Sequence, residues 1–330
     1  MCSSDLAVVF TGGTICMVFD PVAGGNVPSL DGAAILARTP GLDALAEVVP
    51  IDRGLTPASH FTFRDVMTLG GVIQSALDDD AIDGVVVVQG TDTIEETSFA
   101  WDLVLDSSKP VVVTGAMRAS HEDGYDGPAN LRRAVAAAAS PSLRDPGVVV
   151  ALAGTIEAAD DVTKMHTTAF DTFRSPNRGS LGTVGEGGDV VAGLRGPRRR
   201  LRPVPSEGAR VELVEAGIGT DGAMIDAAVA TGARGVVVAA TGAGNTSPGM
   251  LAAAERAMTR EIAVVLASRC PGGAVTTAYA FPGGGGTWVR AGAIPAGTLC
   301  AIKTRVALSL GLGAGLERDG LAKLLADPVG

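Results

Sequence analysis

Three short segments of the sequence carry hydroxyl, carboxylate and amine side chains that could together form a nucleophilic catalytic site. They are Thr14 at the end of TGGT, Thr91 and Asp92 after four valines in VVVVQGTDT, and Lys164 in DDVTKMHTT. A threonine hydroxyl is a poor nucleophile until a base takes its proton. A neutral lysine oriented by a carboxylate can be that base, and N–H groups of a glycine-rich turn can stabilise an oxyanion. The set therefore favours acyl transfer.

Each segment also has an ordinary structural interpretation. The TGGT stretch fits a plain strand–loop turn or a phosphate-binding loop, and Asp92 or Thr93 could cap a following helix. Lys164 could be a surface lysine. However, the chain has 22 arginines and only four lysines, so arginine is its usual surface cation. A buried lysine can lose its proton at working pH and an arginine cannot, which makes the choice of lysine informative.

Strand and helix patterns alternate along the chain, which predicts an α/β fold with parallel sheets. Nearly continuous apolar runs, typical of strands buried on both faces, occur at 6–10, 84–89, 110–114, 147–152, 211–215, 235–240 and 261–267. Helical stretches between them are expected at 63–79, 95–106, 129–139, 248–259 and 301–311. In such sheets, ligands bind beyond the carboxyl ends of the strands, where TGGT and QGTDT both lie.

The length of 330 residues predicts about two domains. The alternation of strand and helix patterns is interrupted by a stretch rich in Gly, Pro and Arg, from about 175 to 209. We therefore expect a large N-terminal domain over 1–190, a linker over 191–209 and a smaller domain over 210–330. The basic run LRGPRRRLRP at 194–203 is interpreted as solvated linker.

Composition excludes several classes of function. A net charge of −10 argues against nucleic-acid or anionic-membrane partners. The four cysteines, Cys2, Cys16, Cys270 and Cys300, form no CxxC pair and HExxH is absent, so a zinc site is not expected. The N-terminus lacks a signal-peptide pattern and no apolar run is long enough to span a membrane, so we expect a soluble, cytoplasmic protein.

Six motifs in this order resemble the bacterial-type L-asparaginase/glutaminase family. They are TGGTI (11–15), GTDTIEET (90–97), VTGAMR (113–118), DGPANL (126–131), DDVTKMHTT (160–168) and TGAGN (241–245). They span essentially the whole chain. The resemblance implies a larger N-terminal domain with a mostly parallel sheet and a smaller C-terminal domain with a flavodoxin-like sheet. It also implies a homotetramer built as a dimer of dimers, or a dimer, and no metal or organic cofactor.

Carried over by motif, the resemblance assigns roles to four residues in the hydrolysis of L-asparagine or L-glutamine. Thr14 would form the acyl enzyme, and Thr91, Asp92 and Lys164 would form a second triad. Asp92 would also hold the α-ammonium of the substrate, beside Gly90. Arg118 is expected to tie the loop 115–127 in place by an ion pair.

The substrate clamp departs from the family pattern. The loop 16–32 has no tyrosine, and the serine that binds the α-carboxylate is replaced by Ala58, with Ser59 one position later. The C-terminal domain of a neighbouring subunit is expected to complete each site, but Ala280 stands where its glutamate would fall. Asn245 matches its motif, whereas Ser247 replaces a second asparagine.

Only Tyr125 and Tyr279 could place a phenol near Thr14. Tyr125, in a turn-rich stretch, could simply anchor a loop. Tyr279 lies next to Ala280, so we hypothesise that it reaches Thr14 from the neighbouring subunit, the alternative being that it only packs at the interface.

Three other functions remain open: a non-catalytic amide or amino-acid binding protein on this fold, a hydrolase of a related amide, and a nucleotide-binding protein. The last lacks both GxGxxG and a P-loop ending. The single histidines, His60, His121 and His166, are expected to be structural, and Trp101, Phe99, Phe170 and Phe173 to lie in the core.

Overall fold

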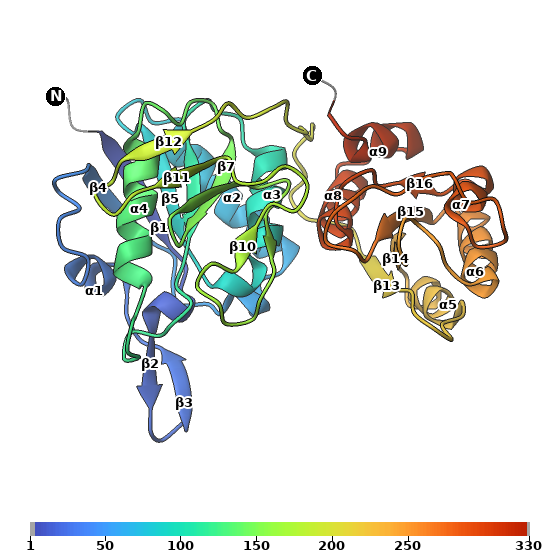
Figure 1. The fold of residues 1–330 in the computed structure, drawn as a ribbon, viewed down its shortest axis with the longest axis horizontal. Coiled ribbons are helices and arrows are strands. Elements are labelled where there is room, and N and C mark those ends of the chain that lie inside the picture. The colour runs from blue at the N-terminus through green and yellow to red at the C-terminus, as the bar shows by residue number, and fades with distance from the viewer. Residues whose placement is uncertain (1–3, 329–330) are drawn as a thin grey trace. The chain divides into compact units, whose positions relative to one another are not determined.

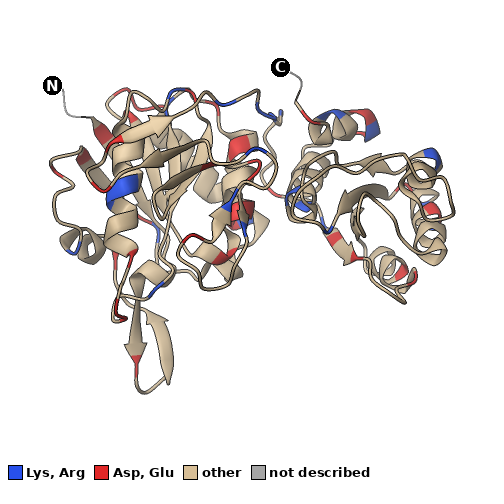
Figure 2. Ribbon diagram, viewed as in Figure 1, with Lys and Arg blue, Asp and Glu red and all other residues tan. Residues whose placement is uncertain are grey.

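The computed structural model describes residues 4–328 and divides into two compact units, Met1–Gly196 and Pro197–Gly330 (Figure 1). Acidic and basic residues are interspersed in both units (Figure 2). No helix within residues 4–328 has both the length and the apolar character to cross a membrane. Cys2 lies outside the described residues, and Cys16, Cys270 and Cys300 are free thiols.

The N-terminal unit is built on an eight-stranded sheet in the order β12-β11-β8-β7-β6-β5-β1-β4. Its parallel strands are β4 (Glu47–Asp52), β1 (Asp5–Phe10), β5 (Gly84–Val88), β6 (Val111–Thr114) and β7 (Val148–Leu152). An antiparallel edge follows, formed by β8 (Thr155–Ala158), β11 (Gly182–Val184) and β12 (Val190–Ala192). The predicted mostly parallel sheet is confirmed.

Helices cover both faces of this sheet, which is why its central strands are valine-rich throughout. The core on one face forms against α4 (Gly127–Ala139), with α1 (Gly32–Ala37) beside it. The other face is covered by α2 (Phe63–Leu77) and α3 (Ile94–Val104). Trp101, Phe99 and Phe173 are buried as predicted, but Phe170 is 38% exposed, so its assignment to the core is wrong.

The segment after Thr14 is a β-hairpin rather than an unstructured loop. A short 3-10 helix, η1 (Thr14–Cys16), leads into β2 (Met17–Asp20), which pairs with β3 (Gly25–Pro28). The hairpin projects from the N-terminal unit (Figure 1). Two further short strands, β9 (Thr163–Lys164) and β10 (Phe173–Arg174), form the antiparallel pair that carries Lys164.

The C-terminal unit contains a small sheet of four parallel strands in chain order, as expected for a second α/β domain. The strands are β13 (Val211–Glu215), β14 (Gly235–Ala240), β15 (Ala263–Ser268) and β16 (Ile294–Pro295). The helices are α5 (Ala223–Ala230), α6 (Pro248–Met258), α7 (Gly285–Ala291), α8 (Ala301–Gly313) and α9 (Arg318–Leu325). Trp288 lies in the core beneath α6.

The basic run at 194–203 is not simply solvated, so that part of the interpretation is wrong. The Arg195 side chain is buried, with one Nη atom 2.7 Å from Asp102 and 2.8 Å from Asp160. Burial alone would raise the pKa of Asp160, but Arg195 and Arg178 outweigh it and hold that pKa at about 2. Two buried carboxylates require a counter-charge, and the run supplies it.

Candidate active site

Two glycine turns bring the ends of β1 and β5 into contact. The Thr11 N–H donates to the Val88 carbonyl at 3.0 Å, which continues the pairing of the strands past Phe10. Beyond it, a Cβ on Gly13 would lie 2.2 Å from the Gly90 nitrogen, and Gly13 has φ of +94°. Only glycine can occupy this position. The turn that precedes Thr14 therefore rests directly on the turn that precedes Thr91.

Thr91, Asp92 and Lys164 form one hydrogen-bonded group. The Lys164 ammonium Nζ donates to Thr91 Oγ1 at 3.0 Å and to Asp92 Oδ1 at 3.0 Å. The Thr91 residue is buried, whereas the Asp92 side chain is 71% exposed and the Lys164 side chain only 16%. The sheltered amine thus contradicts the alternative of a surface lysine, and the Asp92 carboxylate keeps its other oxygen open to the solvent side.

The β9–β10 pair and α3 position Lys164. Phe173 lies opposite Lys164 in the antiparallel pair, and the Lys164 N–H donates to Glu95 Oε2 at 3.2 Å. Glu95 is buried in the first turn of α3. The sequence interpretation missed Glu95 as a site residue; the available signal was a carboxylate one turn after Asp92 on a helix that is otherwise buried.

Neither Asp92 nor Thr93 caps α3, so the capping interpretation is wrong. Thr93 occupies the N-cap position, but its side chain makes no cap hydrogen bond. Instead, Thr93 Oγ1 donates to the Ala58 carbonyl at 3.2 Å, and Asp92 contacts Lys164. The Thr93 hydroxyl and the Asp92 carboxylate, which could have accepted from the free N–H groups of the first helical turn, are bound to other segments.

Thr14 is presented differently from Thr91. It begins η1, is half-buried, and its hydroxyl has no hydrogen-bond partner within residues 4–328. Behind it, Cys16 donates from both its N–H and its thiol to the Gly13 carbonyl, at 3.0 and 2.9 Å. Burial raises the pKa of the Cys16 thiol to about 11, so this neighbour stays neutral.

The loop 115–127 holds the chain immediately after Thr14. The Tyr125 hydroxyl donates to the Ile15 carbonyl at 2.7 Å. Ser120 donates to the Met17 carbonyl from its hydroxyl at 2.8 Å and from its N–H at 3.1 Å. Burial raises the pKa of Tyr125 to about 12, so the phenol remains a donor at neutral pH. Tyr125 is therefore the phenol that this unit places beside the Thr14 segment.

The ion pair expected for Arg118 is absent from the described residues, so this expectation is wrong. The Arg118 guanidinium donates to the Asp123 carbonyl and lies 4.6 Å from the centre of the Phe170 ring. One carboxylate of the loop, that of Asp126, is already occupied by the N–H groups of Met117 and Arg118, at 3.0 Å. Arg118 ties the loop through a carbonyl and a ring face instead.

The expected substrate-binding residues of the N-terminal unit lie on the same edge of the sheet. Ala58 is buried against Gly90, where a Cβ on the glycine would lie 2.9 Å from the Ala58 Cβ. Ser59 follows it in the 3-10 helix η2 (Ala58–His60) and is exposed. The side chain next to Gly90 is therefore the methyl group of Ala58, and the hydroxyl of Ser59 comes one residue later in the chain.

Asn245 and Tyr279 belong to the C-terminal unit. Asn245 closes the turn after β14, and its buried side-chain oxygen accepts no hydrogen bond from residues 4–328. Tyr279 is 45% exposed and its ring lies 5.8 Å from that of Phe281. Ser247, which replaces the second asparagine, accepts the Met250 N–H at 3.3 Å as the N-cap of α6.

His166 is structural, as predicted: its ring Nδ1 accepts the N–H groups of Thr168 and Ala169 at 3.0 Å.

The chain is similar to known proteins over most of its length. Residues 5–194 match the family model "Asparaginase, N-terminal", and residues 210–325 match "Glutaminase/Asparaginase C-terminal domain". A probable L-asparaginase of Deinococcus radiodurans is 36% identical, with 98% of each chain covered. A probable periplasmic L-asparaginase of Haemophilus influenzae is 32% identical, with 93% of this chain and 88% of the relative covered.

Among solved structures, the crystal structure of a probable cytoplasmic L-asparaginase from Campylobacter jejuni has a TM-score of 0.88 at 27% identity. It covers 98% of this chain and 99% of its own. Since both family models match in order and together cover most of the chain, the chain belongs to the asparaginase family.

Proposed function

We propose that the protein hydrolyses the side-chain amide of L-asparagine, and of L-glutamine as a second substrate, to the acid and ammonia. The observation that carries the proposal is the position of the Lys164 amine, 3.0 Å from both Thr91 and Asp92, which follow the glycine turn that touches the Thr14 turn. Two hydroxyls, an amine and a carboxylate then share one sheet edge, as amide hydrolysis through an acyl enzyme requires.

In the first step, Thr14 Oγ attacks the amide carbon of the substrate. Its proton passes to the amide nitrogen, the C–N bond breaks and ammonia leaves, with the acyl group esterified to Thr14. N–H groups of the two glycine turns stabilise the oxyanion. The free Thr14 hydroxyl suits this role, because no interaction with the described residues must be broken before it attacks.

In the second step, water attacks the ester and Thr14 regains its proton. Thr91 is the residue placed to orient that water. Because Lys164 donates to its oxygen, the Thr91 hydroxyl still has its own proton to donate and a lone pair to accept. Lys164, oriented by Asp92 and Glu95, becomes the base behind Thr91 once its amine has lost a proton, because the neutral nitrogen then accepts from the Thr91 hydroxyl instead of donating to it.

The amino-acid end of the substrate requires a clamp. We assign its α-ammonium to the exposed Asp92 carboxylate beside Gly90, and its α-carboxylate to Ser59. Asn245 and Tyr279 would come from a neighbouring subunit, in a tetramer built as a dimer of dimers, or in a dimer. The Asn245 oxygen, which accepts from none of the described residues, and the exposed aromatic pair of Tyr279 and Phe281 support this role.

The domain plan and cellular location are also proposals. We retain a catalytic N-terminal domain over 1–190, a linker over 191–209 and a completing domain over 210–330. A cytoplasmic location is proposed in line with the name of the Campylobacter jejuni protein, and fractionation of cells would test it.

The test is ammonia release from L-asparagine, L-glutamine and their D-isomers, combined with mass spectrometry of enzyme quenched during turnover. We expect ammonia from the L-isomers and an acyl adduct on the peptide that contains Thr14. Tight binding of asparagine with no ammonia would show a binding protein, and release from another amide alone would change the substrate class.

A further inference from the structure

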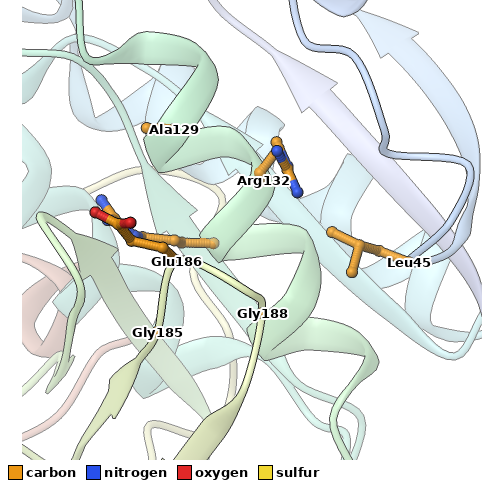
Figure 3. Close-up of a pocket in the computed structure, with 7 residues that line it drawn as sticks. Leu45, Ala129, Arg132, Gly185, Glu186 and Gly188 are labelled. Atoms are coloured by element: carbon orange, nitrogen blue, oxygen red, sulfur yellow. The ribbon is translucent and has the colours of Figure 1, made fainter.

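A small charged cavity lies in the N-terminal unit, apart from the residues assigned to amide hydrolysis. It has a volume of about 200 Å³ between α4 and the turn that joins β11 to β12. Arg132 and Arg133 of α4 line one side. Glu186 lines the turn side and Leu45 lies near Arg132 (Figure 3).

The two guanidiniums of this cavity outnumber its single carboxylate, that of Glu186. Within residues 4–328 neither Arg132 nor Arg133 is in an ion pair, and Arg132 Nε is buried without a hydrogen-bond partner. By contrast, the buried side chain of Arg195 is paired with Asp102 and Asp160. A buried donor that stays unsatisfied is costly, so Arg132 favours a ligand group that can accept its N–H.

The charges and size of the cavity indicate which ligand would supply that group. Two guanidiniums and one carboxylate leave one net positive charge, and a guanidinium favours a planar carboxylate that it can bind with two parallel hydrogen bonds. The volume of about 200 Å³ is below the roughly 300–1,000 Å³ of pockets for drug-sized ligands. A dicarboxylic amino acid has the complementary charges: its two carboxylates would bind the two arginines, and its ammonium would bind Glu186.

We propose that this cavity is a binding site for a dicarboxylic amino acid, such as L-aspartate, separate from the Thr14 site. The ligand class follows from the cavity alone; only its identity as the product of the reaction rests on the proposed function. Bound there, the ligand would bridge α4 to the β11–β12 turn. Because α4 begins directly after Tyr125 and Asp126, the bridge would restrain the helix that follows the Thr14-holding loop.

Calorimetric titration of the whole protein with L-aspartate tests the site. We expect one site per chain, in addition to binding at the Thr14 site, that Arg132→Met removes or weakens by roughly tenfold or more, since hydrogen bonds to charged groups are among the strongest. Arg144→Met is the matched control, because Arg144 carries the same charge on the exposed loop after α4. A titration that Arg132→Met leaves unchanged overturns the proposal.

A second variant tests recognition of the ammonium and does not depend on the partly buried Arg132. Glu186→Gln, on an exposed turn, should weaken L-aspartate by about tenfold while succinate, which has no ammonium, binds no more weakly than before. Inorganic phosphate binding as tightly as L-aspartate, or equal weakening of aspartate and succinate, would show a general anion site and overturn the proposal. If the enzyme releases no ammonia but the Arg132-dependent site persists, the proposed function fails and this inference stands.

Discussion

Thr14 and Thr91 follow neighbouring parallel strands, yet the chain holds them in opposite ways. Thr91 is buried and its hydroxyl is bound by Lys164, so its orientation is fixed through the side chain. Thr14 is half-buried with a free hydroxyl, and its position is fixed through the backbone, by Gly13 against Gly90 and by Tyr125 at the Ile15 carbonyl. The first arrangement suits a group that directs protons, and the second suits a group that must form a bond.

The sharpest way to test this difference is to remove the Thr14 hydroxyl. Thr14→Ala should lower kcat by about three orders of magnitude or more, because covalent catalysis then has no attacking atom. Its melting temperature should match that of the wild type, since the hydroxyl makes no hydrogen bond to the described residues. Thr14→Ser, which keeps a hydroxyl, is the control. Retention of more than about a tenth of the activity by Thr14→Ala would assign the nucleophile elsewhere.

Lys164→Met tests the part of the comparison that concerns Thr91, whose hydroxyl is bound by the Lys164 side chain. We expect kcat to fall by about two to three orders of magnitude, because a general base contributes on that scale. The limb of the pH–rate profile that reports deprotonation of an essential group should also disappear. Lys109→Met is the matched control, since Lys109 instead binds the carbonyls of Leu77 and Asp79. A pH–rate profile that keeps both limbs would make Lys164 a structural residue.

Tyr125→Phe tests whether the hydrogen bond that fixes the backbone next to Thr14 matters for catalysis. Loss of the hydrogen bond to Ile15 should cost about 1 kcal/mol of stability and lower kcat by about tenfold as Thr14 loses its fixed position. KM should change little, because no substrate contact is assigned to Tyr125. Steady-state kinetics and thermal unfolding together separate the outcomes: lower stability with unchanged kcat would reduce Tyr125 to a loop anchor.

Patterns that depend on neighbouring residues along the chain could be predicted from the sequence. Valine runs such as Val85–Val88 must be buried on both faces, so they identified the parallel sheet and therefore the edge where Thr91 and Thr14 meet. The positions of Thr14 and Thr91, the hydroxyls of the proposed site, follow from the same logic, because ligands collect at the carboxyl ends of such strands.

Contacts between segments far apart in the sequence could not be predicted in this way. Glu95 binds the backbone of a residue 69 positions away, and Tyr125 one 110 positions away. A helix-starting pattern cannot show that Thr93 will instead bond to Ala58, nor can an Arg-rich run show that Arg195 will neutralise Asp102 and Asp160. These contacts depend on the register and packing of the whole unit.

Tyr279→Phe carries the smallest expected effect and decides whether Thr14 depends on a second phenol, from a neighbouring subunit. In the hypothesis that Tyr279 reaches Thr14 across the interface, loss of its hydroxyl should lower kcat by about threefold, the scale of one neutral hydrogen bond. The ring should keep its contact with Phe281, so assembly measured by light scattering should not change.

Tyr125→Phe provides the matched comparison, because it removes the same atom from the phenol that lies in the same unit as Thr14. The double variant separates the two roles: independent phenols give multiplied effects, whereas phenols that share one task do not. Wild-type kcat and assembly in Tyr279→Phe would show that Thr14 is held by its own unit alone, with Tyr125 as its only phenol.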